Sequence, residues 1–257
     1  MQIVTVCFDY DDRPEFALLF DVFEASVRRH MPNAEFIAYR PTPPKYDGRN
    51  HGYLDNTFKL DIWCEHMRTT TDQTIFIDCD MLALKDASHV FNQAFDVAYT
   101  ACPDGYMVPL NGGVIFANPT YGARLFFERL REINQRMYDD YEFHKPWQDK
   151  YHGMNQSAMG YILEKYSDGI DILELETREW NAIECDWRHI NDKTVFCHIN
   201  KALRRAVVAR KYPCGSIQKP MSMWYKEKDE LNIKRERNAD SINGRNVARA
   251  DVAEMGA

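Results

Sequence analysis

Two strand-like runs with a helix between them open the chain, and this order restricts the fold more than any other feature. "IVTVCF" (3–8) and "AEFIAY" (34–39) are short and rich in apolar, β-branched or aromatic residues, which is typical of buried strands. A β-α-β unit of this kind builds a parallel sheet through a right-handed crossover. The sequence therefore predicts an α/β protein. Between the two runs, apolar side chains recur at helical spacing at Phe16, Leu19, Phe20, Phe23 and Val27.

The same alternation continues along most of the chain. The loop over 40–53 is rich in proline and glycine, and a loop of that size in a compact domain is often functional. From residue 226 the chain is charged and has few large apolar residues, which predicts a helical arm or a disordered tail. We therefore expect one domain over 1–225 and a separate segment over 226–257. Apolar patterning predicts helices over 56–67, 119–137 and 155–166, and strands over 73–80, 96–101, 112–118, 171–176 and 193–200.

Composition restricts the partners and the compartment. The net charge of −7 disfavours a general nucleic-acid binder, although an acidic protein can bind anionic nucleotides through a bridging divalent cation. The seven cysteines form no C-x-x-C pair, and their odd number suits reduced thiols in the cytosol. The first residues do not have the pattern of a signal peptide, and no apolar run approaches the length of a membrane span. These features together predict a cytoplasmic protein without a membrane span.

Two aspartates stand at the end of the most apolar predicted strand. In "TIFIDCDMLAL" (74–84), Asp78 and Asp80 are one residue apart where the backbone leaves the strand. Ligands bind at the carboxyl ends of strands in open α/β sheets, and carboxylate oxygens are preferred by Mg²⁺ and Mn²⁺. A D-x-D pair also occurs in many surface turns, so the pair alone leaves both a metal site and a polar turn open.

The order of the motifs resembles a known family. The chain is similar to nucleotide-sugar glycosyltransferases of the GT-A fold. The order of its motifs most resembles the glycogenin-like and galactosyltransferase-like family, which is of the family 8 type. That fold is a Rossmann-like, mixed and mostly parallel central sheet flanked by helices. The resemblance covers roughly residues 1–205, and the remaining stretch up to 225 would complete a catalytic domain. It is carried by the N-terminal β-α-β unit, the apolar D-x-D strand, "LNGGVIFAN", "GMNQSAMGYIL" and "FCHINK", in that order.

The resemblance implies a metal and a donor site. Asp78 and Asp80 match the D-x-D that binds the metal, Mn²⁺ or Mg²⁺, and the ribose and diphosphate of the donor. His198 matches the late histidine that completes the metal site, and Lys201 matches a lysine that contacts the diphosphate. The further donor-binding residues implied by the resemblance are Asp9 and Tyr10 at the nucleobase, Lys59 near the phosphate or sugar, and Asn111, Gly112 and Gly113 beside the sugar.

The catalytic segment departs from the family at one position. Gln156 matches the glutamine of an Asp-Gln pair, but the preceding residue is Asn155, which carries no charge. Asp149 is a nearby carboxylate that could replace the missing aspartate. The family's "H-x-x-G-x-x-K" ending also lacks its glycine in "HINKALRR", where Arg204 and Arg205 could supply charge for a phosphate.

Three functions remain as alternatives at this point. The first is a metal-dependent glycosyltransferase that uses a UDP-sugar by preference and an acceptor of unknown kind, whether glycan, lipid-linked sugar, protein or small molecule. A retaining reaction would place Gln156 or Asn155 under the sugar, whereas an inverting one would need a base such as Asp149 or Asp104. The second is a phosphatase of the haloacid-dehalogenase type, with Asp78 as nucleophile. The third is a non-catalytic nucleotide-sugar-binding protein on the same fold.

Overall fold

The computed structural model describes residues 1–8, 10, 15–45, 48, 51–209, 215–232 and 234. A mixed sheet forms the centre, with strands in the order β2-β1-β3-β6-β5-β7. The neighbouring pairs β1–β2, β1–β3 and β5–β7 are parallel, while β6 runs antiparallel to β3 and to β5. A second sheet pairs β4 with β8. The strands are β1 (Gln2–Val6), β2 (Glu35–Tyr39), β3 (Thr74–Asp78), β4 (Met81–Ala83), β5 (Val97–Ala101), β6 (Leu110–Ala117), β7 (Ile172–Glu176) and β8 (Phe196–His198).

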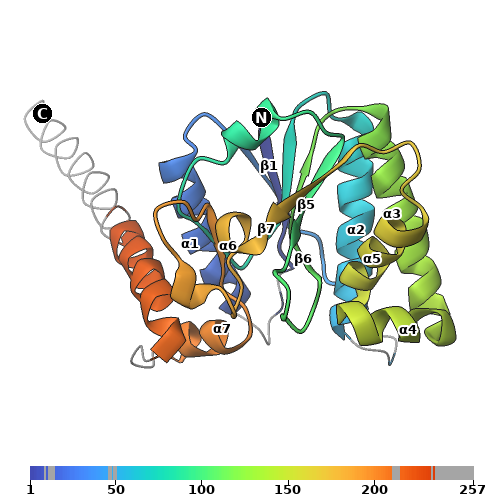
Figure 1. Ribbon diagram of the computed structural model, residues 1–257. Helices are drawn as coiled ribbons and strands as arrows, with labels where there is room; N and C mark the ends of the chain where they lie inside the picture. Colours follow the sequence, from blue (N-terminus) through green and yellow to red (C-terminus); the bar gives the residue numbers. More distant parts are fainter. Residues whose placement is uncertain are drawn as a thin grey trace, which may run out of the picture.

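Helices cover both faces of the central sheet, as Figure 1 shows. One side carries α1 (Glu15–His30), α6 (Thr177–Trp180) and α7 (Lys201–Val208). The other side carries α2 (His51–Thr69), α3 (Tyr121–Asp139), α4 (Tyr141–Tyr151) and α5 (Met154–Lys165). This arrangement of helices on both faces of a mostly parallel sheet confirms the predicted α/β class.

Apolar side chains from both helical layers fill the interior. On the α2 and α3 side, Trp63 and Phe127 pack around Phe76 of β3. On the α1 side, Phe23 packs with Ile75 and with residues of β4 and β8. Because β3 is buried on both faces, its run of apolar residues is continuous rather than alternating. The rigid centre of the sheet therefore ends at the D-x-D segment.

Several elements differ from the sequence-based expectation, among them α2, α4 and β4. Helix α2 begins at His51, inside the predicted loop, and Asn56 donates a hydrogen bond to the carbonyl of Gly52 in its first turns. Helix α4 was not predicted, since its interior contains Pro146, which is unfavourable there; Asp140 caps its first turn. Strand β4 was also not predicted, because three residues give too short a pattern.

A helix over 218–232 crosses the boundary expected at residue 226. Its side chains Met221 and Trp224 are fully buried in a cluster with Leu203 of α7. Glu227 lies 3.1 Å from the Arg29 guanidinium of α1, which Glu230 also contacts. The first part of the predicted arm therefore packs on the domain, and residues 235–257 lie outside the described part of the chain.

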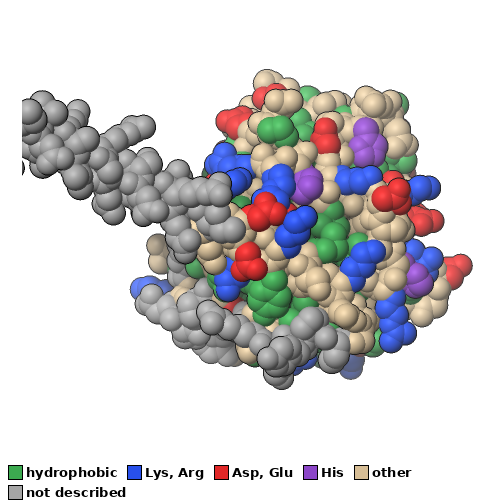
Figure 2. All heavy atoms as spheres, turned by 90° about the vertical axis from the view of Figure 1, so that its left-hand side faces the viewer, with side chains coloured by type: hydrophobic (Ala, Val, Ile, Leu, Met, Phe, Trp, Pro, Cys, Tyr) green, Lys and Arg blue, Asp and Glu red, His purple; other side chains and the backbone are tan. Residues whose placement is uncertain are grey.

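The surface seen in Figure 2 carries both signs of charge. Lys and Arg side chains are interspersed with Asp and Glu over this face, rather than gathered into one basic stripe. Within the described ranges, every helix is too short or too polar to span a lipid bilayer.

Candidate functional site

The D-x-D segment lies where β3 ends and β4 begins. Asp78 is the last residue of β3, in register with Val6 of β1, and Asp80 directly precedes β4. Strand β8 pairs antiparallel with β4, so that His198 is the partner of Met81. The backbone N–H of Ile199 also donates to the carbonyl of Asp80 over 2.8 Å. The β4–β8 pairing therefore places the histidine beside both aspartates.

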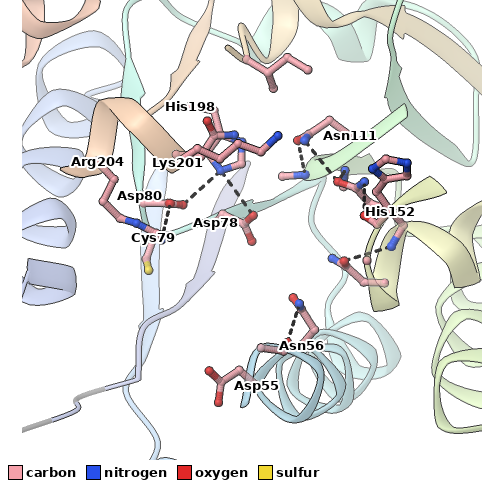
Figure 3. A pocket seen from close by; sticks show the side chains of 18 of the residues that line it. Asp55, Asn56, Asp78, Cys79, Asp80, Asn111, His152, His198, Lys201 and Arg204 are labelled. Atoms are coloured by element: carbon pink, nitrogen blue, oxygen red, sulfur yellow. Dashed lines mark hydrogen bonds and ion pairs between the residues drawn. The ribbon is translucent and has the colours of Figure 1, made fainter. Parts of the chain in front are cut away.

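The three side chains converge on one point, as Figure 3 shows. His198 Nε2 lies 3.2 Å from Asp80 Oδ1 and 3.8 Å from Asp78 Oδ2. One candidate ligand atom from each residue lies within 4.8 Å of the other two. Two carboxylates and one imidazole form a donor set that suits Mn²⁺ or Mg²⁺. The residues therefore fit a divalent metal ion, and the predicted meeting of Asp80 and His198 is confirmed.

Neighbouring charges govern the titration of this cluster. Burial disfavours the charged form of Asp80, but the nearby charge of His198 and a hydrogen bond with it outweigh burial, with help from Arg204, and the pKa of Asp80 is lowered. Burial likewise disfavours the imidazolium of His198, but the charge of Asp80 prevails and the pKa of His198 is raised. The neighbouring carboxylates therefore favour protonation of the His198 ring when no metal is bound.

Lys59 compensates the other aspartate. Its Nζ lies 2.6 Å from Asp78 Oδ1 and 4.6 Å from the centroid of the Trp63 ring. The Lys59 side chain is only 8% exposed, although most lysine ammonium groups reach water. Helix α2 thus directs a buried cation at the D-x-D segment.

Gly113 makes room for the imidazole. A Cβ atom at this position would lie 2.7 Å from His198 Cε1 and 2.8 Å from Nδ1, closer than real contacts allow. His198 Nδ1 is buried and has no hydrogen-bond partner among the described residues. The His198 ring turns its Nε2 toward the carboxylates. Close packing against Gly113 of β6 supports this orientation, rather than a hydrogen bond to Nδ1.

Asn111 and Gln156 join β6 to α5. Asn111 Nδ2 donates to Gln156 Oε1 over 3.3 Å, and the backbone N–H of Gly112 donates to the same oxygen over 3.4 Å. Asn155 is also buried, and its Nδ2 would lie 3.2 Å from a Cβ at Gly112. The two segments "LNGGVIFAN" and "GMNQSAMGYIL", which are separate in the sequence, are thus adjacent in the fold.

One cavity of about 850 Å³ contains these groups. Asp149 is exposed on α4 and, like Asp104, is not among the residues that line the cavity. Asp9 lies outside the described residues. The predicted residues that do line it are Tyr10, Lys59, Asp78, Asp80, Asn111, Gly112, Gly113, Asn155, Gln156, His198 and Lys201.

Two cations at the start of α7 differ in their surroundings. The Lys201 side chain is 72% exposed and its Nζ lies 3.9 Å from Glu184. Its backbone has a φ of 44°, a left-handed conformation that favours glycine, and it occupies the place of the glycine in the family's "H-x-x-G-x-x-K" ending. Arg204 takes the place of the final lysine, and its Nη1 lies 3.4 Å from Asp80 Oδ2. Of these two cations, Arg204 is therefore the one that contacts the carboxylate cluster, on the side of Asp80.

Asn181 was not predicted from the sequence, and the structure connects it to the cavity residues. This asparagine follows α6 and is fully buried, and its Nδ2 donates to Asn111 Oδ1 over 2.8 Å. A single asparagine in "EWNAI" has no motif around it, so only the fold reveals the contact.

Comparisons with known proteins agree with this geometry at the level of the fold. No protein-family model matches the sequence, and no curated protein matches it. Among solved structures, the galactosyltransferase LgtC, crystallised with donor and acceptor sugar analogues, matches with a TM-score of 0.56 and 11% identity over 90% of this chain and 96% of that one. GlyE, a glycosyltransferase of Streptococcus pneumoniae TIGR4, matches with a TM-score of 0.55 and 14% identity over 92% of this chain and 64% of that one.

A third similar structure is a glycosyltransferase involved in glycosylation of the major capsid of PBCV-1. It matches with a TM-score of 0.54 and 12% identity over 80% of this chain and 97% of that one. At these identities the matches establish the fold, and the predicted GT-A architecture is confirmed. The chemistry of this chain has to be argued from its own residues.

Proposed function

We propose that this protein is a metal-dependent glycosyltransferase that transfers a sugar from a nucleotide-diphosphate sugar, by preference a UDP-sugar, to an acceptor hydroxyl. The observation that carries the proposal is the convergence of Asp78, Asp80 and His198 in a cavity of about 850 Å³ within a glycosyltransferase fold. Their ligand atoms come from β3, the turn after it and β8, so the cluster is not a product of local sequence.

Asp78, Asp80 and His198 would hold Mn²⁺ or Mg²⁺. When bound, the ion would neutralise the diphosphate and stabilise the leaving nucleoside diphosphate. Arg204, at the edge of the cluster, would add a fixed positive charge for the same phosphates. Lys59 would hold Asp78 in place while remaining in reach of the cavity.

The sugar would lie beside Asn111, Asn155 and Gln156, which line the cavity next to the carboxylate cluster. Asp149, the predicted substitute for the missing aspartate, lies outside the cavity lining. This supports a retaining reaction without a base at Asp149: the acceptor oxygen would bond to C1 as the bond between C1 and the diphosphate oxygen breaks, and the hydroxyl proton would pass to the departing diphosphate. The acceptor would enter through the remaining part of the cavity, near Tyr106 and Met107.

The release of nucleoside diphosphate tests the proposal. UDP-, GDP- and ADP-sugars would be incubated with the protein and Mn²⁺, with and without a chelator. We expect one class of donor to release its nucleoside diphosphate, and Asp80→Asn to reduce the rate about 100-fold. Asp192→Asn is the matched control, because Asp192 is an exposed aspartate in the turn before β8. Release that is unaffected by Asp80→Asn or by the chelator would contradict the proposal.

A non-catalytic nucleotide-sugar-binding protein is the second candidate, and Asn155 is the observation that favours it. An amide replaces the charged member of the family's Asp-Gln pair at a buried position in the cavity wall. Metal-dependent binding of UDP without release from any donor would support this candidate. The phosphatase alternative has less support, since Asp78 ends the third strand along the chain; release of inorganic phosphate from phosphomonoesters would be its signature.

A further inference from the structure

We propose that Asn181 is a positioning residue that fixes the side-chain amides of Asn111 and Gln156 for the donor sugar. This inference rests on the proposed function and extends it to a residue outside the cavity. Asn181 is fully buried behind the cavity wall, at the end of α6, and is not among the lining residues. It can therefore act on a ligand only through its neighbours.

The amide of Asn181 has one orientation that suits its neighbours. Its Nδ2 donates to Asn111 Oδ1 over 2.8 Å and to Thr100 Oγ1 over 3.0 Å. The Thr100 hydroxyl uses its single proton on the backbone carbonyl of Asn111, over 2.9 Å, so toward Asn181 it can only accept. Asn181 must therefore turn its NH₂ group, and not its oxygen, toward both partners.

Asn111 links the Asn181 amide to Gln156 in the cavity wall through hydrogen bonds. Its Oδ1 accepts from Asn181 and also from the backbone N–H of Gly113, over 3.0 Å. A backbone N–H cannot become an acceptor, so this oxygen is held on two sides. Asn111 Nδ2 is left to face Gln156 Oε1. The polarity of the Asn111 amide is thus determined by Asn181 and Gly113 together.

Gln156 is held at both ends of its amide. Its Oε1 accepts from Asn111 Nδ2 and from the N–H of Gly112, and its Nε2 donates to the backbone carbonyls of Tyr151, over 2.7 Å, and His152, over 3.0 Å. Both Nε2 protons are therefore in use within the protein. Toward a sugar, Gln156 can offer its oxygen as an acceptor or as a partner for positive charge at C1, but no proton.

The observed orientation of the Asn181 amide leaves its side-chain oxygen without a hydrogen-bond partner among the described residues. This oxygen, Oδ1, is buried. A flipped amide would place that oxygen against Asn111 Oδ1, and the two acceptors would repel each other. The observed orientation therefore keeps both donated hydrogen bonds of Asn181 and leaves its oxygen without a partner among the described residues.

The variant Asn181→Asp tests this role, because it replaces the donating NH₂ group with an oxygen at nearly constant shape. Asn134→Asp is a closely matched control. Asn134 is also buried, its Nδ2 donates to a threonine hydroxyl, that of Thr57, over 2.7 Å, and its Oδ1 is also without a partner. Asn134 belongs to α3 and does not line the cavity, so this control reports the cost of a buried carboxylate alone.

Three readouts are compared between the two variants, and each has an expected result. The side-chain amide NMR signals of Asn111 and Gln156 should shift in Asn181→Asp and stay in place in Asn134→Asp. Binding of UDP in the presence of Mn²⁺ should remain within about twofold of the parent in both, since neither asparagine belongs to the candidate metal-binding group Asp78, Asp80 and His198. The kcat for release of nucleoside diphosphate should fall about 100-fold in Asn181→Asp only.

If either aspartate variant does not fold, Asn181→Ser and Asn134→Ser repeat the comparison without a new charge. Equal kcat values for the Asn181 and Asn134 variants, or unshifted amide signals, would overturn the role of Asn181 while the parent remained active. A parent that releases no nucleoside diphosphate would overturn the proposed function, and this inference with it. The two failures are therefore distinguishable from the parent alone.

Discussion

His198 Nε2 lies 3.2 Å from Asp80 Oδ1, although the two residues are far apart in the sequence: Asp80 lies in the turn between β3 and β4, and His198 is the last residue of β8. The contact is produced by the antiparallel pairing of β4 with β8, in which Met81 and His198 are partners. Strand pairing holds backbone positions more firmly than a loop does, so the donor set is rigid before any ligand arrives. The following predictions concern the groups that support this contact.

Gly113→Ala should displace the His198 ring. The new Cβ would lie 2.7 Å from Cε1 of a ring that is itself buried, so the imidazole or β6 must move. We expect a loss of about 1–3 kcal/mol of stability and a large decrease in Mn²⁺ affinity, measured by calorimetric titration. Gly169→Ala is the control, since its φ of 76° makes alanine unfavourable there while the space around it is open. Unchanged Mn²⁺ affinity in Gly113→Ala would show that the ring orientation is unimportant.

The pH dependence should have opposite signs with and without metal. The folded pKa of His198 is raised above 6.5, because the charge of Asp80 outweighs burial. In the metal-free protein this stabilisation is fully present below about pH 6.5 and is lost as the pH rises through the raised pKa. Metal binding requires the neutral ring, so Mn²⁺ affinity should rise about tenfold per pH unit until that pKa is passed.

Thermal unfolding between about pH 5 and 8, with and without Mn²⁺, measures both slopes. His198→Gln should remove them, whereas His189→Gln, at an exposed histidine, should leave them in place. Parallel curves with and without metal would contradict the assignment of His198 as a ligand.

Lys59→Met should destabilise the metal-free protein by about 1–3 kcal/mol, because Asp78 would lose its compensating charge at a half-buried site. Mn²⁺ should restore more of the melting temperature in this variant than in the parent, since a cation would replace the missing ammonium. Lys150→Met is the control: its Nζ lies at the same 2.6 Å from Glu164, but both side chains are more exposed. Equal losses in the two variants would argue against a special role for Lys59.

Arg204→Met should weaken UDP binding in the presence of Mn²⁺ about tenfold, because Arg204 is the cation of α7 that contacts the D-x-D carboxylates. Arg188→Met removes an exposed arginine from the segment before β8 and serves as the control. Calorimetric titration of UDP into each variant measures the effect. If Arg204→Met binds UDP as tightly as the control does, the phosphate charge must come from another residue.

Much of the sheet could be predicted from local pattern. β1, β3 and α1 follow from runs and periodicities that lie within a few residues of each other, and burial on both faces explains why β3 is continuously apolar. Helix α4 and strand β4 were missed for a physical reason: Pro146 obscures the first, and long-range pairing with β8 creates the second.

Some residues of the site could be predicted from the sequence, and others could not. Motif order was enough to anticipate Asp78, Asp80 and His198, because their chemistry restricts what they can do. Asn181 could not be anticipated, since its role depends on the distances to Thr100 and Asn111, which only the folded chain determines. The resemblance implied Lys201 as the lysine that contacts the diphosphate, with Arg204 and Arg205 as further sources of charge; the fold shows that Arg204, and not Lys201, contacts Asp80.

A crystal structure of the protein soaked with Mn²⁺ and UDP tests the central claim most directly. Anomalous scattering would locate manganese independently of the chain. The account predicts one strong peak within coordination distance, roughly 2–2.5 Å, of oxygens of Asp78 and Asp80 and of His198 Nε2, with the diphosphate of UDP on its open side. A manganese ion bound elsewhere in the cavity, or UDP bound with no ion between these three residues, would contradict it.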